Sequence, residues 1–256
     1  MVGLQCRALM LISKKVNVFY LLIALFSPAS FACEQTFRVS VADAWPPFSF
    51  KKGNDYQGID IEIVEAVFST AGYCWQYVSY PSSKRALKEL ELGNVDMLFA
   101  ATKTDERSKY AHFSVSYREE EMMVFSLLGA KNVDYFSIKH LFGVSRGSVY
   151  GRDFEAFRTF CPDCVVNTNT VSERFGMLRS KRIDYVIEER ITGMNYIKTL
   201  GLDGIKLLPQ AVHSEGLKFM FSKAHIKPEQ LHKIDQAIRS NKELIQSKIN
   251  STYLKK

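Results

Sequence analysis

The sequence predicts an α/β protein with two units, each a mostly parallel sheet flanked by helices. Between residues 37 and 101, β-prone segments alternate with segments of helical spacing, and the alternation resumes after residue 142. Strands that alternate with helices in this way run parallel, and the helices cover the sheet. The 224 residues that follow position 32 are enough for one or two such domains.

The first unit starts with an alternating, β-prone strand that ends just before two adjacent prolines. Pro46 and Pro47 cannot continue a hydrogen-bonded ladder, so we expect a loop at 44–48. The following helix carries apolar residues on one face, at Ile63, Val64, Val67 and Phe68. In chain order, we expect a strand at 37–42, this helix ending at Gly72, a strand at 74–80, a helix capped by Ser82 or Ser83 and closed by Gly93, and a strand at 95–101.

The second unit repeats the alternation without a detectable repeat of the sequence itself. An apolar strand at 122–128 leads into it. Since no low-complexity linker separates the units, we expect closure on a hinge rather than movement on a tether. The remaining predicted elements are strands at 142–145, 165–167, 183–187, 205–208 and 216–221, and helices at 150–160, 171–178, 191–200, from Pro228, and at 242–253.

Residues 1–32 have the composition of a secretory signal peptide. Basic residues precede an apolar run at 16–26, and the small residues Ser30 and Ala32 suit a cleavage site. The apolar run has 11 residues, whereas a membrane span takes about 20. We therefore predict export to the periplasm and cleavage after Ala32, with Met10 as a second candidate start of translation.

Four cysteines follow the predicted cleavage site, and their even number in an oxidising compartment favours disulfides. Three pairings are possible; in the simplest, Cys161 pairs with Cys164 and Cys33 pairs with Cys74. A redox role for the Cys-x-x-Cys motif is disfavoured, since such motifs open a helix and this one follows a predicted helix. Cys33 directly follows the cut, but the residues before it do not match a lipoprotein signal.

The composition argues against nucleic-acid binding, metal binding and catalysis. The formal charge of +7 falls to about +4 without the leader, and there is no Lys/Arg tract of the nucleic-acid-binding type. The five histidines are scattered without metal-ligand spacing, and no nucleophile elbow occurs. We therefore expect no cofactor, no metal, no nucleic-acid partner and no catalytic residues.

Polar and aromatic residues follow the predicted strands at their carboxyl ends. Open parallel sheets bind ligands outside these ends. The segments to consider are 43–48, 101–107, 146–150 and 188–190. Each carries polar or aromatic groups that suit a small charged solute.

Several short motifs occur in a characteristic order: Pro47-Phe48, Gly58-Ile59-Asp60-Ile61, Gly93-Asn94-Val95-Asp96, Thr102-x-Thr104-x-Glu106-Arg107 and Phe113-Ser114-x-Ser116-Tyr117. With them the chain resembles the extracellular solute-binding proteins of family 3, which serve polar amino-acid ABC transporters. The resemblance implies the two-lobed periplasmic-binding-protein fold with a two-strand hinge. It places lobe 1 at 33–126 plus 215–256 and lobe 2 at 127–214, with hinge strands at 122–128 and near 211–215.

The resemblance also implies a ligand clamp in the first lobe. In amino-acid-binding members, an arginine at the position of Arg107 grips the α-carboxylate, with a hydroxyl at the position of Thr102. Surface pairing of Arg107 with a neighbouring acid is the alternative. Trp45 matches an aromatic that stacks on the ligand, and Ala100 stands where many members have Ser.

In the second lobe, the resemblance implies a turn at 147–149, where Ser148 and Val149 face the ligand carboxylate. It assigns the α-amino group to Glu189, where the family more often has Asp, with Glu188 adjacent. Capping of the next helix is the alternative role for Glu189. The departures at Ala42, Ala100 and Glu189 leave a short peptide, an amine or an organic acid open as ligand.

The implied function is capture of a small polar solute, an amino acid or a relative, by hinge closure of a monomer, followed by delivery to an ABC-transporter permease. Two alternatives remain. The chain could be a ligand-sensing adaptor for a membrane receptor. It could also resemble the cyclohexadienyl dehydratases of the same fold, with Glu188 or Glu189 as the acid.

Overall fold

The structure is a computed structural model that describes residues 33–129 and 136–254. The predicted signal peptide, residues 1–32, lies outside the described residues. Eight strands form the main sheet: β1 (Thr36–Val41), β5 (Cys74–Ser79), β6 (Met97–Ala101), β7 (Ala111–Leu127), β8 (Phe142–Ser145), β9 (Val165–Thr168), β10 (Tyr185–Glu189) and β11 (Ile205–Ser222). The helices are α2 (Ile59–Ala71), α3 (Ser83–Glu91), α4 (Asp105–Ser108), α5 (Arg152–Phe160), α6 (Val171–Arg179), α7 (Arg190–Thr199), α8 (Pro228–Ser240) and α9 (Lys242–Leu254).

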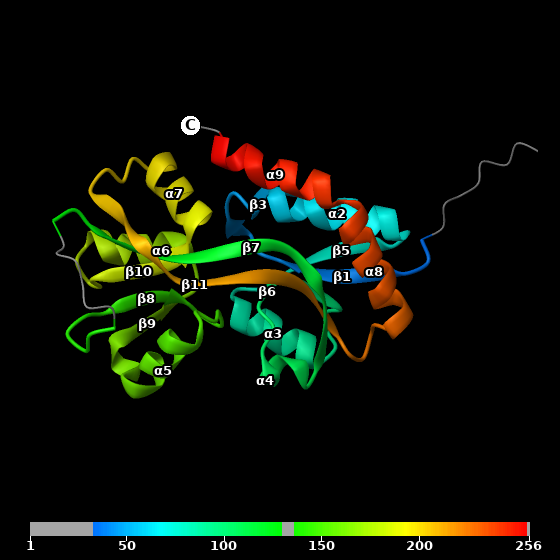
Figure 1. Ribbon diagram of the computed structural model, residues 1–256, viewed down its shortest axis with the longest axis horizontal. Coiled ribbons are helices and arrows are strands. Elements are labelled where there is room, and N and C mark those ends of the chain that lie inside the picture. Colours follow the sequence, from blue (N-terminus) through cyan, green and yellow to red (C-terminus); the bar gives the residue numbers. More distant parts are fainter. Residues whose placement is uncertain (1–32, 130–135, 255–256) are drawn as a thin grey trace, which may run out of the picture. The chain divides into compact units, whose positions relative to one another are not determined.

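The strand order in the main sheet is β5-β1-β6-β11-β7-β10-β8-β9. β5, β1 and β6 run parallel and form the first half; β10, β8 and β9 run parallel and form the second half. The long strands β7 and β11 lie side by side and antiparallel between the halves, and they pair with strands of both (Figure 1). The predicted α/β class with two mostly parallel units is confirmed.

The two long strands differ from their predicted form. The sequence indicated short strands at 122–128, 205–208 and 216–221, whereas β7 spans 17 residues and β11 spans 18. β11 changes register against β7 at several points, including between Leu207 and Ala211. Such bulges interrupt the two-residue alternation and bend the strand, so each continuous strand looks like separate pieces in the sequence.

A small antiparallel sheet was missed at the predicted loop. β2 (Ala44–Trp45), β3 (Ser49–Lys52) and β4 (Asp55–Gln57) pair in that order. Pro46 and Pro47 lie in the turn between β2 and β3, where neither has to donate to a ladder. The turn is closed by the Phe48 amide, which donates to the Trp45 carbonyl over 3.0 Å.

The first half has an apolar core on each face. α2, α8 and α9 lie on one face and α3 and α4 on the other (Figure 1). The apolar stripe predicted for α2 is fully buried, and α2 ends at Gly72, which has a left-handed φ of 72°. Phe37 of β1 makes edge contacts with Phe68, Tyr73 and Phe221 in this core.

The second half is built in the same way. Phe154 and Phe157 of α5 pack on one face of its sheet, while α6 and α7 cover the other face, around Phe125 and Phe175. Gly193 of α7 lies directly over Phe125, so a Cβ at this position would be 2.1 Å from the ring. A glycine is therefore needed for α7 to approach β7.

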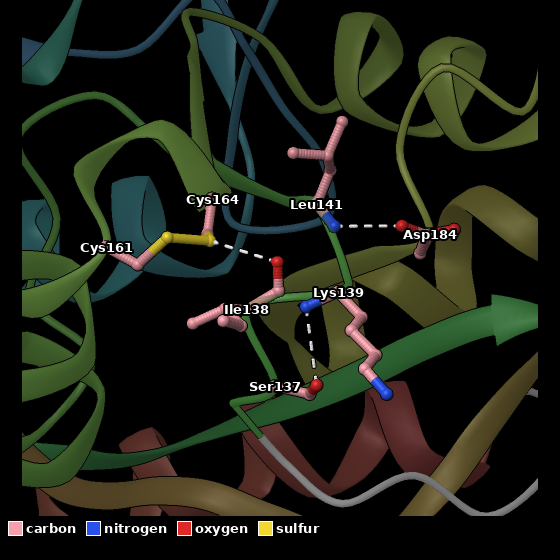
Figure 2. The surroundings of a disulfide bond; sticks show 7 residues. All are labelled: Ser137, Ile138, Lys139, Leu141, Cys161, Cys164 and Asp184. Atoms are coloured by element: carbon pink, nitrogen blue, oxygen red, sulfur yellow. Dashed lines mark hydrogen bonds between the residues drawn. A yellow bond between two sulfur atoms is a disulfide. The ribbon is translucent and has the colours of Figure 1, made fainter.

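The predicted Cys161–Cys164 disulfide is present and lies at the end of α5, where a short 3₁₀ helix, η1 (Pro162–Cys164), leads into β9 (Figure 2). The Cys164 sulfur lies 3.7 Å from the carbonyl oxygen of Ile138, a residue of the segment before β8. Cys33 and Cys74 are also in disulfide form, and their mutual pairing stays a prediction. The Cys-x-x-Cys motif follows a helix, as the sequence indicated.

We predict that Gly193→Ala destabilises the protein by about 1–3 kcal/mol, because the added methyl group overpacks a buried contact. Gly176→Ala in α6 is the matched control, since a Cβ there meets no atom within 4 Å. Alanine should be neutral or slightly stabilising at this helical position. Urea unfolding of both variants measures the difference, and equal midpoints would contradict the packing argument.

Candidate functional site

A cavity of about 380 Å³ lies where the carboxyl ends of the parallel strands meet. Its walls come from both halves of the sheet. The first half contributes the segments that follow β1 and β6, and the second half contributes those that follow β8 and β9, together with Glu188 at the end of β10. This is the position at which open α/β sheets bind ligands.

Six of the seven residues predicted to contact a ligand line this cavity, and Glu189 does not. The six come from three stretches of the chain, at or after the ends of β1, β6 and β8. They are Trp45, Ala100, Thr102, Arg107, Ser148 and Val149.

Arg107 lies in α4 and is only 9% exposed. Its Nη1 donates to the Thr102 carbonyl over 2.9 Å, and its Nη2 donates to the Gly147 carbonyl over 2.8 Å. No carboxylate in the described part of the chain forms an ion pair with it, in contrast to the surface pairing that the sequence left open. Burial lowers the pKa of Arg107 from its ordinary value. The cavity wall therefore holds a cation without a counter-ion.

The contact between Arg107 and Gly147 joins the two halves across the cavity. Gly147 has a φ of +91°, and a Cβ there would lie 2.7 Å from the backbone nitrogen of Lys84 in α3. The loop after β8 therefore packs closely against the first turn of α3. The two halves touch here, and the cavity lies between them.

Ala100 has a backbone conformation that is rare for its residue type. Its φ is +53°, and its amide donates to the Tyr117 hydroxyl over 3.2 Å. Left-handed non-glycine residues away from helix ends are uncommon, and they gather at binding and active sites. A residue with a strained backbone therefore lies in the wall of the cavity.

Trp45, which the family resemblance assigns to stacking on the ligand, is half-buried. Its ring centroid lies 4.9 Å from that of Phe48, and the Arg118 guanidinium lies 5.5 Å from its ring. Trp45 also packs against apolar clusters of both halves. It is thus both a packing residue and part of the cavity wall.

Glu189 has a structural task in the second half. It is 2% exposed, and its carboxylate accepts the backbone amides of Ile191 and Thr192, over 3.0 and 2.7 Å, as the N-cap of α7. This is the capping role that the sequence left open. Burial raises the pKa of Glu189 to about 7, against the lowering effect of Arg118 and of the two amides.

Two charged cavity residues, Glu120 and Arg174, were missed as ligand candidates, and a third, Glu188, was named only as the neighbour of Glu189 and as a possible acid. Arg174 Nε donates to Glu188 over 3.0 Å, and its Nη1 donates to the Thr168 hydroxyl over 3.0 Å. Arg174 is buried on the apolar face of α6, three residues after Val171. A charge in phase with an apolar stripe was the signal that could have identified it.

Glu120 lies on β7, two residues after Arg118 and on the same side of the strand. Arg118 forms a buried ion pair with Asp60, with two hydrogen bonds of 2.8 Å. Glu120 itself is 7% exposed and lines the cavity. Burial raises its pKa to about 8; Arg118 opposes this rise, and Glu189, Glu188 and Asp60 add to it.

Neither a membrane span nor a metal cluster is found in the described chain. No helix within residues 33–129 and 136–254 combines the length and apolar character that crossing a membrane requires. The same residues contain no group of three or more His, Cys, Asp or Glu side chains that could hold a metal ion.

Residues 37–254 match the family described as bacterial extracellular solute-binding proteins, family 3. The chain belongs to this family. Among curated relatives, the arginine-binding extracellular protein ArtP of Bacillus subtilis (strain 168) is 28% identical over 207 residues, covering 78% of this chain and 79% of that protein. The solute-binding family and the recognition made from the sequence motifs are thus confirmed.

Solved structures show the same fold. An ancestral arginine-binding protein bound to arginine superposes with a TM-score of 0.72 at 24% identity, covering 87% of this chain and 98% of that one. The ancestral amino-acid-binding protein AncCDT-1, a precursor of cyclohexadienyl dehydratase, has a TM-score of 0.69 at 22% identity, with 85% and 93% covered. The predicted two-lobed fold is confirmed, and the two halves of the sheet are its lobes.

We predict that stability falls as pH rises from about 5 to 8. The folded pKa values of Glu120 and Glu189, about 8 and 7, lie above the ordinary value of 4.5. In this window the two carboxyls lose their protons in the unfolded chain but keep them in the folded protein. Raising the pH therefore favours unfolding, and each carboxyl lowers the free energy of unfolding by at most about 1.4 kcal/mol per pH unit. Urea unfolding at several pH values measures this slope.

Glu120→Gln should make the slope shallower, because it removes one of the two titrating groups. Glu119→Gln is the matched control, since Glu119 is exposed on the same strand and should keep the wild-type slope. Identical slopes for the two variants would contradict the assignment of a raised pKa to Glu120.

Proposed function

We propose that this protein is a periplasmic substrate-binding protein that captures an amino acid or a related polar solute and delivers it to an ABC transporter. The observation that carries the proposal is Arg107, a buried guanidinium in the cavity wall that has no counter-ion in the described part of the chain. A volume of about 380 Å³ lies at the small end of the range for ligand sites. Family membership supports a solute-binding role.

A carboxylate is the ligand group that fits Arg107 best. The guanidinium is a planar fork whose N–H donors match the two carboxylate oxygens, and burial strengthens such charge-assisted bonds. The side chains of Thr102 and Ser148 also line the cavity and can donate hydroxyl hydrogen bonds. The curated relatives named for binding arginine and amino acids support a ligand of the amino-acid type.

Closure of the two lobes around the ligand distinguishes the loaded protein from the empty one, and the transporter can recognise this difference. With lobe 1 at 33–126 plus 215–256 and lobe 2 at 127–214, as the sequence predicts, β7 and β11 connect them, and the ligand bridges Arg107 and the loop after β8. A permease would then recognise the outer faces of a closed monomer. The leader predicted at residues 1–32 supports export to the periplasm.

We predict that Arg107→Ala abolishes binding of the L-amino acid that stabilises the wild-type protein in a thermal-shift panel. Ligand at a hundred times its Kd stabilises by about 2.7 kcal/mol, which gives a readily measured shift. Arg107→Lys keeps the charge but loses the fork, so it should restore only part of the binding.

Lys103→Ala is the control for this test, because it removes a positive charge from the same segment at an exposed position. Its thermal shift should equal that of the wild type. An L-amino acid that still binds Arg107→Ala with wild-type affinity would refute the clamp.

We predict that Gly147→Ala weakens the same ligand, because the methyl group would collide with the backbone of Lys84 and hold the lobes apart. Gly53→Ala is the matched control: Gly53 has a φ of +64°, and a Cβ there meets no atom within 4 Å. Both positions have a positive φ, and only at Gly147 would the added methyl group meet the other half of the sheet. Calorimetry gives the affinities, and small-angle scattering gives the size of the ligand-free protein. A Gly147→Ala protein with wild-type affinity would rule out this closure contact.

A further inference from the structure

We propose that Glu120 receives a protonated amine or guanidinium group of the ligand whose carboxylate is held by Arg107. This inference rests on the proposed function and specifies its ligand: a solute that carries an anionic and a cationic group. Glu120 was not among the residues that the sequence motifs indicated.

Glu120 is a buried carboxylate that faces the cavity without a partner. It is 7% exposed and lines the cavity. Within residues 33–129 and 136–254, no hydrogen-bond donor or cation pairs with its side chain. A carboxylate buried in this way costs several kcal/mol unless it is protonated or meets a cation, so its charged form calls for a positive ligand group.

The other carboxylates near the cavity are already engaged. Glu188 pairs with Arg174, and Glu189 caps α7. Asp43 accepts a hydrogen bond of 2.9 Å from the Tyr56 hydroxyl and is exposed. The amino-group role that family resemblance assigns to Glu189 is therefore better met by Glu120.

Charged residues on β7, α2, β10 and β11 lie around Glu120. Arg118 of β7 is neutralised by Asp60 of α2. Glu188 and Glu189 lie at the end of β10. On β11, the residue paired with Glu120 is Glu215, whose carboxylate contacts a histidine, His213. Arg174 of α6 pairs with Glu188, and Lys218 of β11 lies 4.0 Å from Glu215. Arg118, Arg174 and Lys218 thus each face an acid already, which favours a ligand cation over a second carboxylate beside Glu120.

Binding of a cation at Glu120 has a pH signature. The pKa of about 8 means that the free protein holds a proton on Glu120 at pH 7. A bound cation stabilises the carboxylate, so Glu120 passes that proton to the solvent on binding. Affinity should rise with pH from 6 to 8, by at most tenfold per unit.

The test uses calorimetry with three probes: L-arginine, L-glutamine and the dianion glutarate. At least one of the two amino acids should bind the wild-type protein with release of about one proton at pH 7, measured in buffers of different ionisation enthalpy. Glu120→Gln should weaken this binding by about 10- to 100-fold and abolish its pH dependence. Glu119→Gln, at an exposed position of the same strand, should behave as the wild type.

Two outcomes overturn the inference while the proposed function stands. One is wild-type affinity and proton release in Glu120→Gln, and the other is binding of glutarate alone. Absence of binding by all three probes to both the wild type and Glu119→Gln would overturn the proposed amino-acid function together with the Glu120 assignment. Thermal unfolding of each variant shows that it is folded.

Discussion

The buried ion pair between Asp60 and Arg118 connects helix α2 to strand β7, which runs through both lobes. Both side chains are almost fully inaccessible, and the guanidinium lies 3.9 Å from the Phe48 ring. Breaking such a pair leaves a buried charge, at a cost of about 3–5 kcal/mol. Gly58 belongs to the same arrangement, since a Cβ there would lie 2.2 Å from the Phe48 carbonyl oxygen. The Gly58-Ile59-Asp60 motif is thus explained by close approach and charge pairing.

The same strand, β7, also places a charged residue, Glu120, in the wall of the cavity. Arg118 and Glu120 share one side of β7, so an engaged cation stands next to a carboxylate that is not engaged. Arg107 of α4 contributes the opposite charge to the cavity wall. Arg107 and Glu120 are the buried cation and the buried acid that have no charged partner among the described residues, and this combination suits a solute with both charges. Closure desolvates these groups and strengthens their interactions.

Local patterns predicted much of the fold and of the site. Apolar spacing, caps and glycines located the helices and the parallel strands to within a few residues, because these signals arise between neighbours in the chain. Six of the seven ligand contacts implied by the strand ends and the family resemblance line the cavity, and their contact with a ligand stays a prediction. The long strands β7 and β11 were underestimated because bulges interrupt their alternation. The small β2–β4 sheet was missed because its prolines lie in a turn.

The sequence by itself determined the α/β class, the alternation of elements, the Cys161–Cys164 disulfide and the cavity position of Arg107. Only the tertiary structure decided which acids line the cavity and which of them are paired. Glu188, Glu189 and Glu120 look alike in the sequence. In the described part of the chain, Glu188 pairs with Arg174, Glu189 caps α7, and Glu120 has no hydrogen-bonding or charged partner. Burial depends on segments that the fold brings together, so the sequence alone does not show which carboxylate is left unpaired in the cavity.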